Sequence, residues 1–191
     1  MKVVARSTER VVVGKRLVLV GFFCLMTGVV SAQPATPLSM ADQRAKSVTQ
    51  VVLGILSYAR WPVEPAQLRL CVVGPTEYTD DLVKGTTQAT GRPVTVQRLL
   101  ADNPAVVSEC DALYIGKLTP DERSRLFASL VGHPVLSISE GVDQCTVGSL
   151  FCLRVSDDQV SFEVNLDSVA RSGVRIHPSV LQLSRRKPAT P

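Results

Sequence analysis

Short apolar segments alternate with helical patterns between residues 39 and 184, and this alternation limits the possible folds more than any other feature of the sequence. Four segments rich in apolar residues are predicted strands: Leu68–Val73, Val94–Leu99, Ala112–Ile115 and Val135–Ile138. Helical patterns precede or separate them at Ala41–Ala59, Glu77–Lys84 and Pro120–Leu130. This order of elements favours a parallel sheet with helices on both faces.

The first of these helices has one apolar face. Its side chains follow the i, i+3, i+4 spacing of a helix at Val48, Val51, Val52, Ile55, Leu56 and Ala59. Ser39 suits the N-cap position. We expect Pro62 to end the helix after Trp61, because the residue before a proline avoids helical geometry.

The last part of the chain adds a predicted hairpin. Two apolar segments, Leu150–Val155 and Val160–Val164, flank the turn sequence Asp157-Asp158-Gln159. We therefore predict a three-layer α/β sandwich, with a mostly parallel, Rossmann-like sheet of five or six strands and a C-terminal antiparallel hairpin.

The pattern of residues 161–184 predicts, in order, the end of a strand, a short helix, an extended link and a last helical turn. Asn165 or Asp167 can cap the short helix at its start. Gly173 stands where the end of a helix favours a left-handed residue.

Residues 1–32 have the organisation of a secretory signal peptide. Five basic residues lead into an apolar run of 14 residues, Leu17–Val30, which is short for a membrane span of about 20. The small residues of Val30-Ser31-Ala32 predict cleavage before Gln33. An uncleaved membrane anchor is the alternative. Cys24 lacks the small-residue context of a lipoprotein cleavage site, so we predict no lipid anchor.

Removal of this segment would leave a neutral chain of 159 residues. Residues 1–32 carry a net charge of +4, which equals that of the whole chain. The positive net charge of the whole chain therefore gives no support for binding of the mature chain to nucleic acid or to an anionic membrane. We expect a leader over residues 33–38, one α/β domain over 39–184 and a flexible tail over 185–191.

Four cysteines lie outside the predicted signal peptide: Cys71, Cys110, Cys145 and Cys152. An even number in an exported protein indicates disulfides, and four cysteines allow three pairings. The short spacing between Cys145 and Cys152 favours a local loop, which leaves Cys71 to pair with Cys110. Buried free thiols are the alternative. A zinc site is not favoured, because the chain has no C-x₂₋₄-C pair and its two histidines are far apart.

The sequence lacks the usual motifs of nucleotide binding and hydrolysis. The turn after the first strand, residues 74–81, has neither glycine-rich pattern that cradles phosphate. The chain also lacks G-x-S-x-G and H-E-x-x-H. The acid pairs Asp80-Asp81 and Asp157-Asp158 fit solvated turns, and His133 fits a loop. We therefore predict that the protein is not an enzyme and that it holds no cofactor or metal.

One group of residues suggests a binding surface. In the extended link before Pro178, Arg175 and His177 project to the same side of the chain. Arg60 stands at the predicted end of the first helix, and Glu163, on the polar side of the last strand, could orient one of these cations. Together they would suit an aromatic ring or a carboxylate of a partner. The simpler alternative is that each of the four is solvated.

An ordered set of short motifs runs along the whole predicted mature chain. It comprises Ala59-Arg60-Trp61-Pro62, Leu70-Cys71-Val72-Val73-Gly74, Gly91-Arg92-Pro93-Val94, Cys110-Asp111-Ala112-Leu113-Tyr114-Ile115-Gly116, Phe162-Glu163-Val164-Asn165-Leu166, Ser172-Gly173-Val174-Arg175-Ile176 and Leu181-Gln182-Leu183. No single motif is specific, but in this order they resemble the YfiR family of periplasmic regulators.

This resemblance implies a periplasmic repressor. Members of this kind hold an inner-membrane diguanylate cyclase, YfiN, inactive by acting on its periplasmic sensor region. An outer-membrane lipoprotein, YfiB, sequesters the repressor, after which cyclic-di-GMP rises and favours biofilm. The resemblance also implies a homodimer, stabilisation by disulfides, and a pocket of Arg60, Glu163, Arg175 and His177 for an aromatic residue of the lipoprotein.

Two other functions compete with this interpretation. A periplasmic small-molecule binder or transport accessory would use the carboxyl ends of the parallel strands, where open α/β sheets bind ligands. A hydrolase would need a nucleophile and a base, and no such pair stands out in the sequence.

Overall fold

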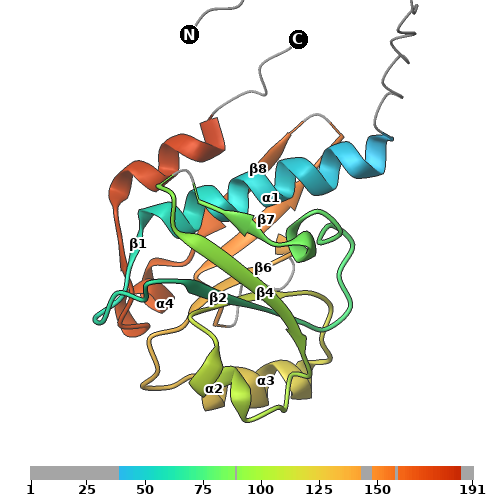
Figure 1. Ribbon diagram of the computed structural model, residues 1–191. Helices are drawn as coiled ribbons and strands as arrows, with labels where there is room; N and C mark the ends of the chain where they lie inside the picture. The colour runs from blue at the N-terminus through green and yellow to red at the C-terminus, as the bar shows by residue number, and fades with distance from the viewer. Residues whose placement is uncertain (1–38, 89, 143–147, 158, 186–191) are drawn as a thin grey trace, which may run out of the picture. The chain divides into compact units, whose positions relative to one another are not determined.

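The computed structural model of the chain describes residues 39–88, 90–142, 148–157 and 159–185 (Figure 1). The predicted signal peptide, the leader and residues 186–191 of the predicted tail lie outside this part of the chain. None of the described helices is long and apolar enough to cross a membrane.

The elements follow one another in the mixed order that the sequence predicts. In chain order they are α1 (Met40–Tyr58), β1 (Ala59–Arg60), β2 (Leu68–Val73), the 3₁₀ turn η1 (Leu82–Lys84), β3 (Thr86–Thr87), β4 (Pro93–Leu99), α2 (Ala105–Glu109), β5 (Ala112–Ile115), α3 (Pro120–Ser129), β6 (Leu136–Ser139), β7 (Phe151–Val155), β8 (Val160–Val164), α4 (Leu166–Arg171), β9 (Arg175–Ile176) and the 3₁₀ helix η3 (Pro178–Arg185).

A mostly parallel sheet forms the centre of the domain, with the strand order β3-β4-β2-β5-β6-β7-β8. The five strands from β4 to β7 run parallel, whereas β3 and β8 pair antiparallel at the two edges. This confirms the predicted fold class and the C-terminal hairpin. The sheet has seven strands instead of six, because the sequence analysis missed the two-residue strand β3.

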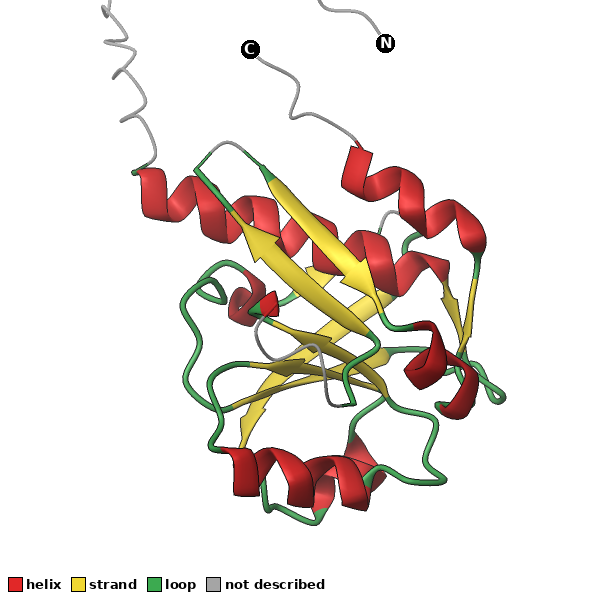
Figure 2. Ribbon diagram, turned by 180° about the vertical axis from the view of Figure 1, so that it is seen from behind, coloured by secondary structure: helices red, strands yellow, loops and turns green. Residues whose placement is uncertain are grey.

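The sheet separates two apolar cores, and Figure 2 shows α1 on one side of it and α2 with α3 on the other. Alternate residues of β2 supply both: Leu70 and Val72 belong to the core beneath α1, whereas Cys71 and Val73 belong to the core beneath α2 and α3. This alternation is the period of two that places successive side chains on opposite faces of a strand. The architecture is therefore the predicted three-layer sandwich.

Helix α1 begins as predicted but ends earlier. A capping box joins Ser39 to Asp42, and the apolar face buries side chains such as Val52 and Ile55. The prediction that the helix ends after Trp61 is wrong: it ends at Tyr58, and the backbone of Ala59 is extended. From Ala59 onward the chain pairs with β9 instead of continuing the helix, because this pairing satisfies backbone groups that the last helical turn leaves without partners.

Two further local predictions need correction. The predicted helix over Glu77–Lys84 is only the short turn η1, and the amides of Glu77 and Tyr78 donate hydrogen bonds to the side chain of Glu140. The sequence analysis also missed α2, whose first amide, that of Ala105, donates to the side chain of Asn103 over 2.9 Å.

The C-terminal segment follows its predicted order of strand, helix, link and helical turn. Asn165 caps α4 through its side chain, and Gly173 adopts the left-handed conformation after it, with φ of 72°. The extended link contains β9, and the last turn is η3. Leu183 of η3 lies against Gly54 of α1, where the absence of a side chain lets the two helices approach closely.

Candidate functional site

A short antiparallel ladder between β1 and β9 brings two of the predicted site residues together. The register places Arg60 directly opposite Arg175, and Ala59 opposite Ile176. Residues directly opposite each other in such a pair have neighbouring side chains on one face. Both arginine side chains are exposed, whereas Ala59 is buried and Ile176 is partly buried. The ladder therefore holds two cations side by side on its outer face.

His177 extends this cationic surface by one position. Its backbone amide donates to the carbonyl oxygen of Tyr58 over 3.0 Å, which continues the ladder beyond β9. Its ring is stacked on that of Tyr58, with 6.2 Å between the centroids and 29° between the planes. The Nδ1 atom of His177 accepts a hydrogen bond from the amide of Ser179. The imidazole is thus exposed but fixed in orientation.

Arg60 also closes the end of α1. Its Nη1 atom donates to the carbonyl oxygens of Ser57 and Ala59, over 2.9 and 2.7 Å. A cation near the last carbonyls of a helix is favoured by their partial negative charge. These bonds hold one side of the guanidinium against the helix, and the exposed remainder is available to a partner.

Glu163 is engaged elsewhere. It lies on β8, and its Oε1 atom pairs with Nη2 of Arg154 on β7 over 2.8 Å. Both side chains are exposed, so this is a surface ion pair across the hairpin. The ion pair that the structure shows for Glu163 is with Arg154, and the suggestion that Glu163 orients Arg60, Arg175 or His177 stays a prediction.

We call Arg60, Arg175 and His177, together with the ring of Tyr58, the cationic face. Two like charges in direct register repel each other, so an anion between them would be stabilised by both. The ring of Tyr58 adds an apolar, polarisable surface beside them. The chemistry of this face suits a carboxylate or an aromatic side chain of another protein.

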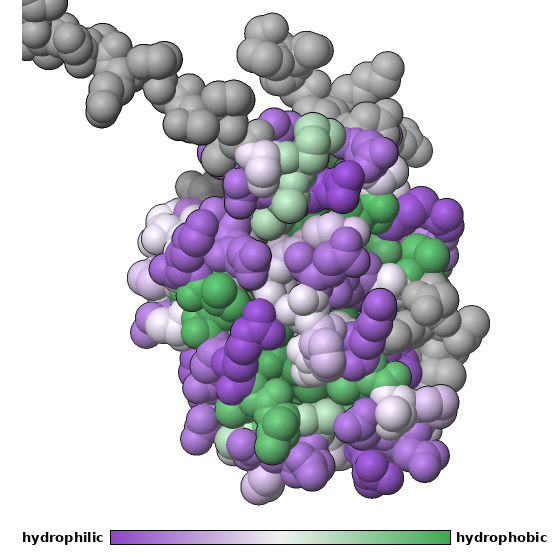
Figure 3. Space-filling model, turned by 90° about the vertical axis from the view of Figure 1, so that its right-hand side faces the viewer, coloured by the Kyte–Doolittle hydropathy of each residue, from purple (hydrophilic) through white to green (hydrophobic). Residues whose placement is uncertain are grey.

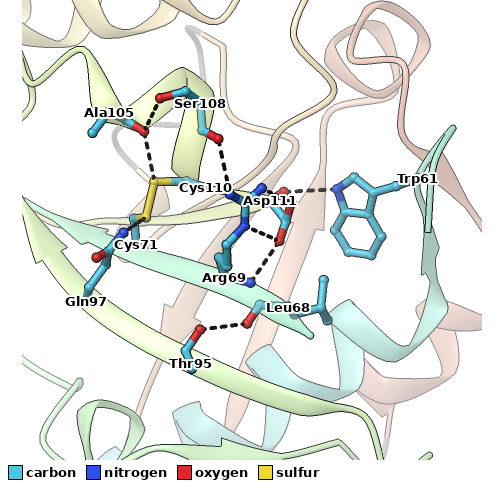
Figure 4. Close-up of polar contacts among 10 residues, drawn as sticks. All are labelled: Trp61, Leu68, Arg69, Cys71, Thr95, Gln97, Ala105, Ser108, Cys110 and Asp111. Carbon is cyan, nitrogen blue, oxygen red and sulfur yellow. Dashed lines mark hydrogen bonds and ion pairs between the residues drawn. A yellow bond between two sulfur atoms is a disulfide. The ribbon is translucent and has the colours of Figure 1, made fainter. Parts of the chain in front are cut away.

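The predicted bridge between Cys71 and Cys110 is present, with sulfur atoms 2.00 Å apart (Figure 4). It joins β2 to the residue that follows α2. Both cysteines are buried in the core beneath α2 and α3. The bridge therefore connects the layer of α2 and α3 to β2, an inner strand of the sheet.

The structure describes only one of the other two cysteines, Cys152. Cys152 lies buried in β7 and takes part in a disulfide. Its predicted partner, Cys145, lies outside the described residues, so the pairing of these two remains a prediction.

Asp111 forms a polar junction next to the disulfide, as Figure 4 shows. Its carboxylate accepts hydrogen bonds from the backbone amide, Nε and Nη2 of Arg69, over 2.9, 3.1 and 2.8 Å. Its carbonyl oxygen accepts from the indole nitrogen of Trp61 over 3.0 Å. Trp61 is thus a buried core residue.

The sequence analysis gave Asp111 no role, since a single aspartate before a strand carries no specific signal. The pKa of Arg69 is raised, chiefly by its hydrogen bond to the Asp111 carboxylate, with burial acting in the opposite direction. The pair joins β2 to the start of β5 and includes no residue of the cationic face.

A crevice of about 280 Å³ lies at the carboxyl ends of the parallel strands, where the rival small-molecule function would be located. Residues from the ends of four strands line it: Glu77 and Tyr78 after β2, Gly116 and Lys117 after β5, Glu140 after β6, and Leu153–Val155 of β7. Figure 3 shows the side of the domain toward which β4 points in Figure 1, and there hydrophilic side chains border exposed apolar surface.

Glu140 is the central group of this crevice, and the sequence analysis missed it. Its carboxylate accepts hydrogen bonds from the amides of Glu77 and Tyr78, each over 2.9 Å, and from the hydroxyl of Tyr114 over 3.0 Å. Burial, followed by the charge of Glu140, raises the pKa of Tyr114 well above its usual range. An acidic residue two positions after the predicted strand Val135–Ile138 was the available signal.

The described residues offer no cluster of three or more histidine, cysteine, aspartate or glutamate side chains that could hold a metal ion.

Comparison with protein families matches most of the chain. Residues 45–185 match the model of the YfiR/HmsC-like family, also described as a domain of unknown function, DUF4154. The match includes most of α1, both sheets, the Cys71–Cys110 bridge and the cationic face. It agrees with the resemblance of the sequence motifs.

Proposed function

Because the chain belongs to the YfiR/HmsC-like family of periplasmic regulators of diguanylate cyclase signalling, we propose that it is a repressor that holds an inner-membrane diguanylate cyclase inactive through the periplasmic region of that enzyme. An outer-membrane lipoprotein relieves the repression by sequestering the chain. Release of the cyclase raises cyclic-di-GMP and favours biofilm formation. The chain itself catalyses no reaction, and its predicted signal peptide delivers it to the periplasm.

The observation that carries the proposal is the register of Arg60 and Arg175 in the β1–β9 ladder. This register places two exposed cations and the ring pair of His177 and Tyr58 on one face. We assign this face to the lipoprotein, because its chemistry would accept an aromatic side chain or a carboxylate. Glu163, which is paired with Arg154, is not assigned to this face.

Two surfaces with coupled occupancy are enough for such a switch. If capture by the lipoprotein prevents contact with the cyclase, each partner weakens binding of the other by the same factor. A stable scaffold that presents both surfaces meets this need without a catalytic group. We further propose that the chain acts as a homodimer, which light scattering of the purified mature protein would test.

A reconstituted assay tests the assignment. Membranes that contain the cyclase should form less cyclic-di-GMP when the purified mature chain is added, and addition of the lipoprotein should restore synthesis. The triple variant Arg60→Ala, Arg175→Ala, His177→Ala should still inhibit the cyclase, but the lipoprotein should relieve it at least ten-fold less effectively.

Arg125→Ala is the matched control, because it removes an exposed arginine from α3, on the opposite side of the sheet. This variant should respond to the lipoprotein as the wild type does. Relief of the triple variant at wild-type lipoprotein concentrations would show that the cationic face is not the capture surface. Failure of the wild-type chain to inhibit the cyclase would contradict the repressor function itself.

A further inference from the structure

The crevice at the carboxyl ends of β2 and β5 lies where the direction of winding of the sheet reverses. Strand β2 has β4 on one side and β5 on the other. The connection from β2 to β4 contributes Leu82 to the core beneath α1, whereas that from β4 to β5 contributes Val106 to the opposite core. In doubly wound sheets, such a switch point is the place where ligands bind.

The loop after β2 directs two consecutive backbone amides into this crevice. The Glu77 amide lies 2.9 Å from both carboxylate oxygens of Glu140, and the Tyr78 amide lies 2.9 Å from one of them. The hydroxyl of Tyr114 reaches the same oxygen over 3.0 Å. Consecutive amides that converge on one oxyanion form an anion-binding concavity, or nest.

Several contacts that do not involve Glu140 hold this loop in place. Close approach of the loops after β2 and β5 is possible because residue 116 is glycine, and the Lys117 amide donates to the Pro75 carbonyl over 2.8 Å. The hydroxyls of Thr76 and Thr79 lie 2.6 Å apart, and Arg98 donates to Thr79 over 2.8 Å. The amides should therefore keep their direction when the Glu140 carboxylate is removed.

We propose that this crevice is an oxyanion-binding site whose anion is supplied by the chain itself, the carboxylate of Glu140. The internal carboxylate satisfies the nest and, with its negative charge, excludes a second anion. The sheet therefore keeps the geometry of a phosphate site while nucleotide phosphates have no place to bind. Removal of the carboxylate opens the site to a free oxyanion such as inorganic phosphate or acetate.

The inference stands apart from the proposed function, because it rests only on the contacts of Glu140. The test compares wild type, Glu140→Ala and Glu140→Gln in sodium phosphate, in sodium acetate and in sodium chloride at equal ionic strength. Melting temperature is the first readout. Amide chemical shifts of Glu77 and Tyr78 are the second, since a stability change elsewhere in the domain would not move these two signals selectively.

Phosphate or acetate should raise the melting temperature of Glu140→Ala by a few degrees, roughly 2–4 °C, relative to chloride. The same anions should shift the Glu77 and Tyr78 amide signals to saturation. Wild type and Glu140→Gln should not respond, because the native carboxylate and the glutamine carbonyl oxygen both still occupy the nest.

Three outcomes would overturn the proposal. Glu140→Ala could fold without responding to either anion, or the wild type could bind phosphate as tightly as the variant does. In the third outcome, Glu140→Ala and Glu140→Ser would both fail to fold even in phosphate, although a free anion should then replace the missing carboxylate.

Discussion

Asp111 shows how one residue can join three segments of the chain. Its side chain binds Arg69 at the edge of β2, and its carbonyl oxygen binds the indole of Trp61. Its amide donates to the carbonyl of Arg69 over 2.9 Å, so the two residues are joined through backbone and side chain alike. Residue 110, next to it, carries the disulfide.

Loss of the Asp111 carboxylate should lower stability through Arg69. The Asp111 side chain is 11% exposed but that of Arg69 is 45% exposed, so solvent screens part of their attraction. We predict a coupling energy of about 1 kcal/mol between Asp111→Ala and Arg69→Ala. Urea denaturation of the two single variants and the double variant measures it, and additive losses would show that the ion pair contributes nothing.

Tyr114 should make the domain less stable at alkaline pH. Its hydroxyl is buried beside Glu140, which raises the pKa of the phenol in the folded state. Above about pH 10 the unfolded chain loses this proton and the folded chain keeps it. The stability from Tyr114 is thus complete below pH 10 and is lost as the pH rises further, by about 1.4 kcal/mol per pH unit.

Tyr114→Phe should remove this dependence. Between pH 8 and 11 the unfolding free energy of the variant should fall less steeply, with a slope that corresponds to about one proton fewer. Tyr78, whose pKa burial also raises, continues to contribute to the slope of both proteins. At neutral pH the variant should be slightly less stable, because it lacks the hydrogen bond to Glu140. Equal slopes for variant and wild type would contradict this account.

At the scale of elements, glycines decide how closely neighbouring segments approach. A Cβ atom at Gly116 would overlap the carbonyl oxygen of Pro75, which is backbone and is held by the Lys117 amide. A Cβ atom at Gly54 would lie 2.8 Å from Cδ1 of Leu183, the far end of a flexible side chain. The first contact cannot adjust without moving a strand end, whereas the second can.

Gly116→Ala should therefore be much more damaging than Gly54→Ala. We predict a loss of about 3 kcal/mol or more for Gly116→Ala from overpacking. For Gly54→Ala we predict a small change, because the higher helix propensity of alanine, worth about 1 kcal/mol, offsets the displacement of Leu183. Thermal unfolding of both variants provides the measurement, and similar losses would refute the distinction between backbone and side-chain contact.

Local patterns predicted the elements whose own residues determine them. Strands β2 and β5 have the predicted bounds, because each is an apolar run that ends at a glycine. Distant partners determined the elements that the sequence analysis missed. Pairing with β9 makes a strand of Arg60, and pairing with β4 makes a strand of Thr86 and Thr87.

The same difference applies to the candidate site. The alternation around Pro178 predicted that Arg175 and His177 face one side, and the ladder with β1 adds Arg60 through its register. The sequence predicted the hairpin of β7 and β8 but not its register, which places Arg154 and Glu163 at diagonal positions.

At the scale of the whole molecule, we expect the Cys71–Cys110 bridge to contribute to stability and not to partner binding. The two cysteines are 39 residues apart in the chain. Closing a loop of this length stabilises a domain by about 4 kcal/mol in the chain-entropy model, and the short loop predicted for Cys145 and Cys152 by less. Cys71→Ser or Cys110→Ser should therefore lower the melting temperature more than Cys145→Ser. The opposite order in calorimetry would refute the assignment of the structural bridge.

Lower stability of an exported protein reduces its abundance, so the variants of Cys71 and Cys110 should release the cyclase in cells. Arg60→Ala, Arg175→Ala and His177→Ala change exposed side chains and should leave abundance close to that of the wild type. Immunoblots of periplasmic extracts separate the two sets before any signalling is measured.

The most direct test of the repressor account is the level of cyclic-di-GMP in cells that lack the native gene and carry one of these variants, with the lipoprotein either silent or overproduced. We predict high cyclic-di-GMP for the Cys71 and Cys110 variants in both conditions. We predict a level that stays low for the triple variant of the cationic face even when the lipoprotein is abundant. A triple variant that responds to the lipoprotein as the wild type does, or cysteine variants that lower cyclic-di-GMP, would contradict the account.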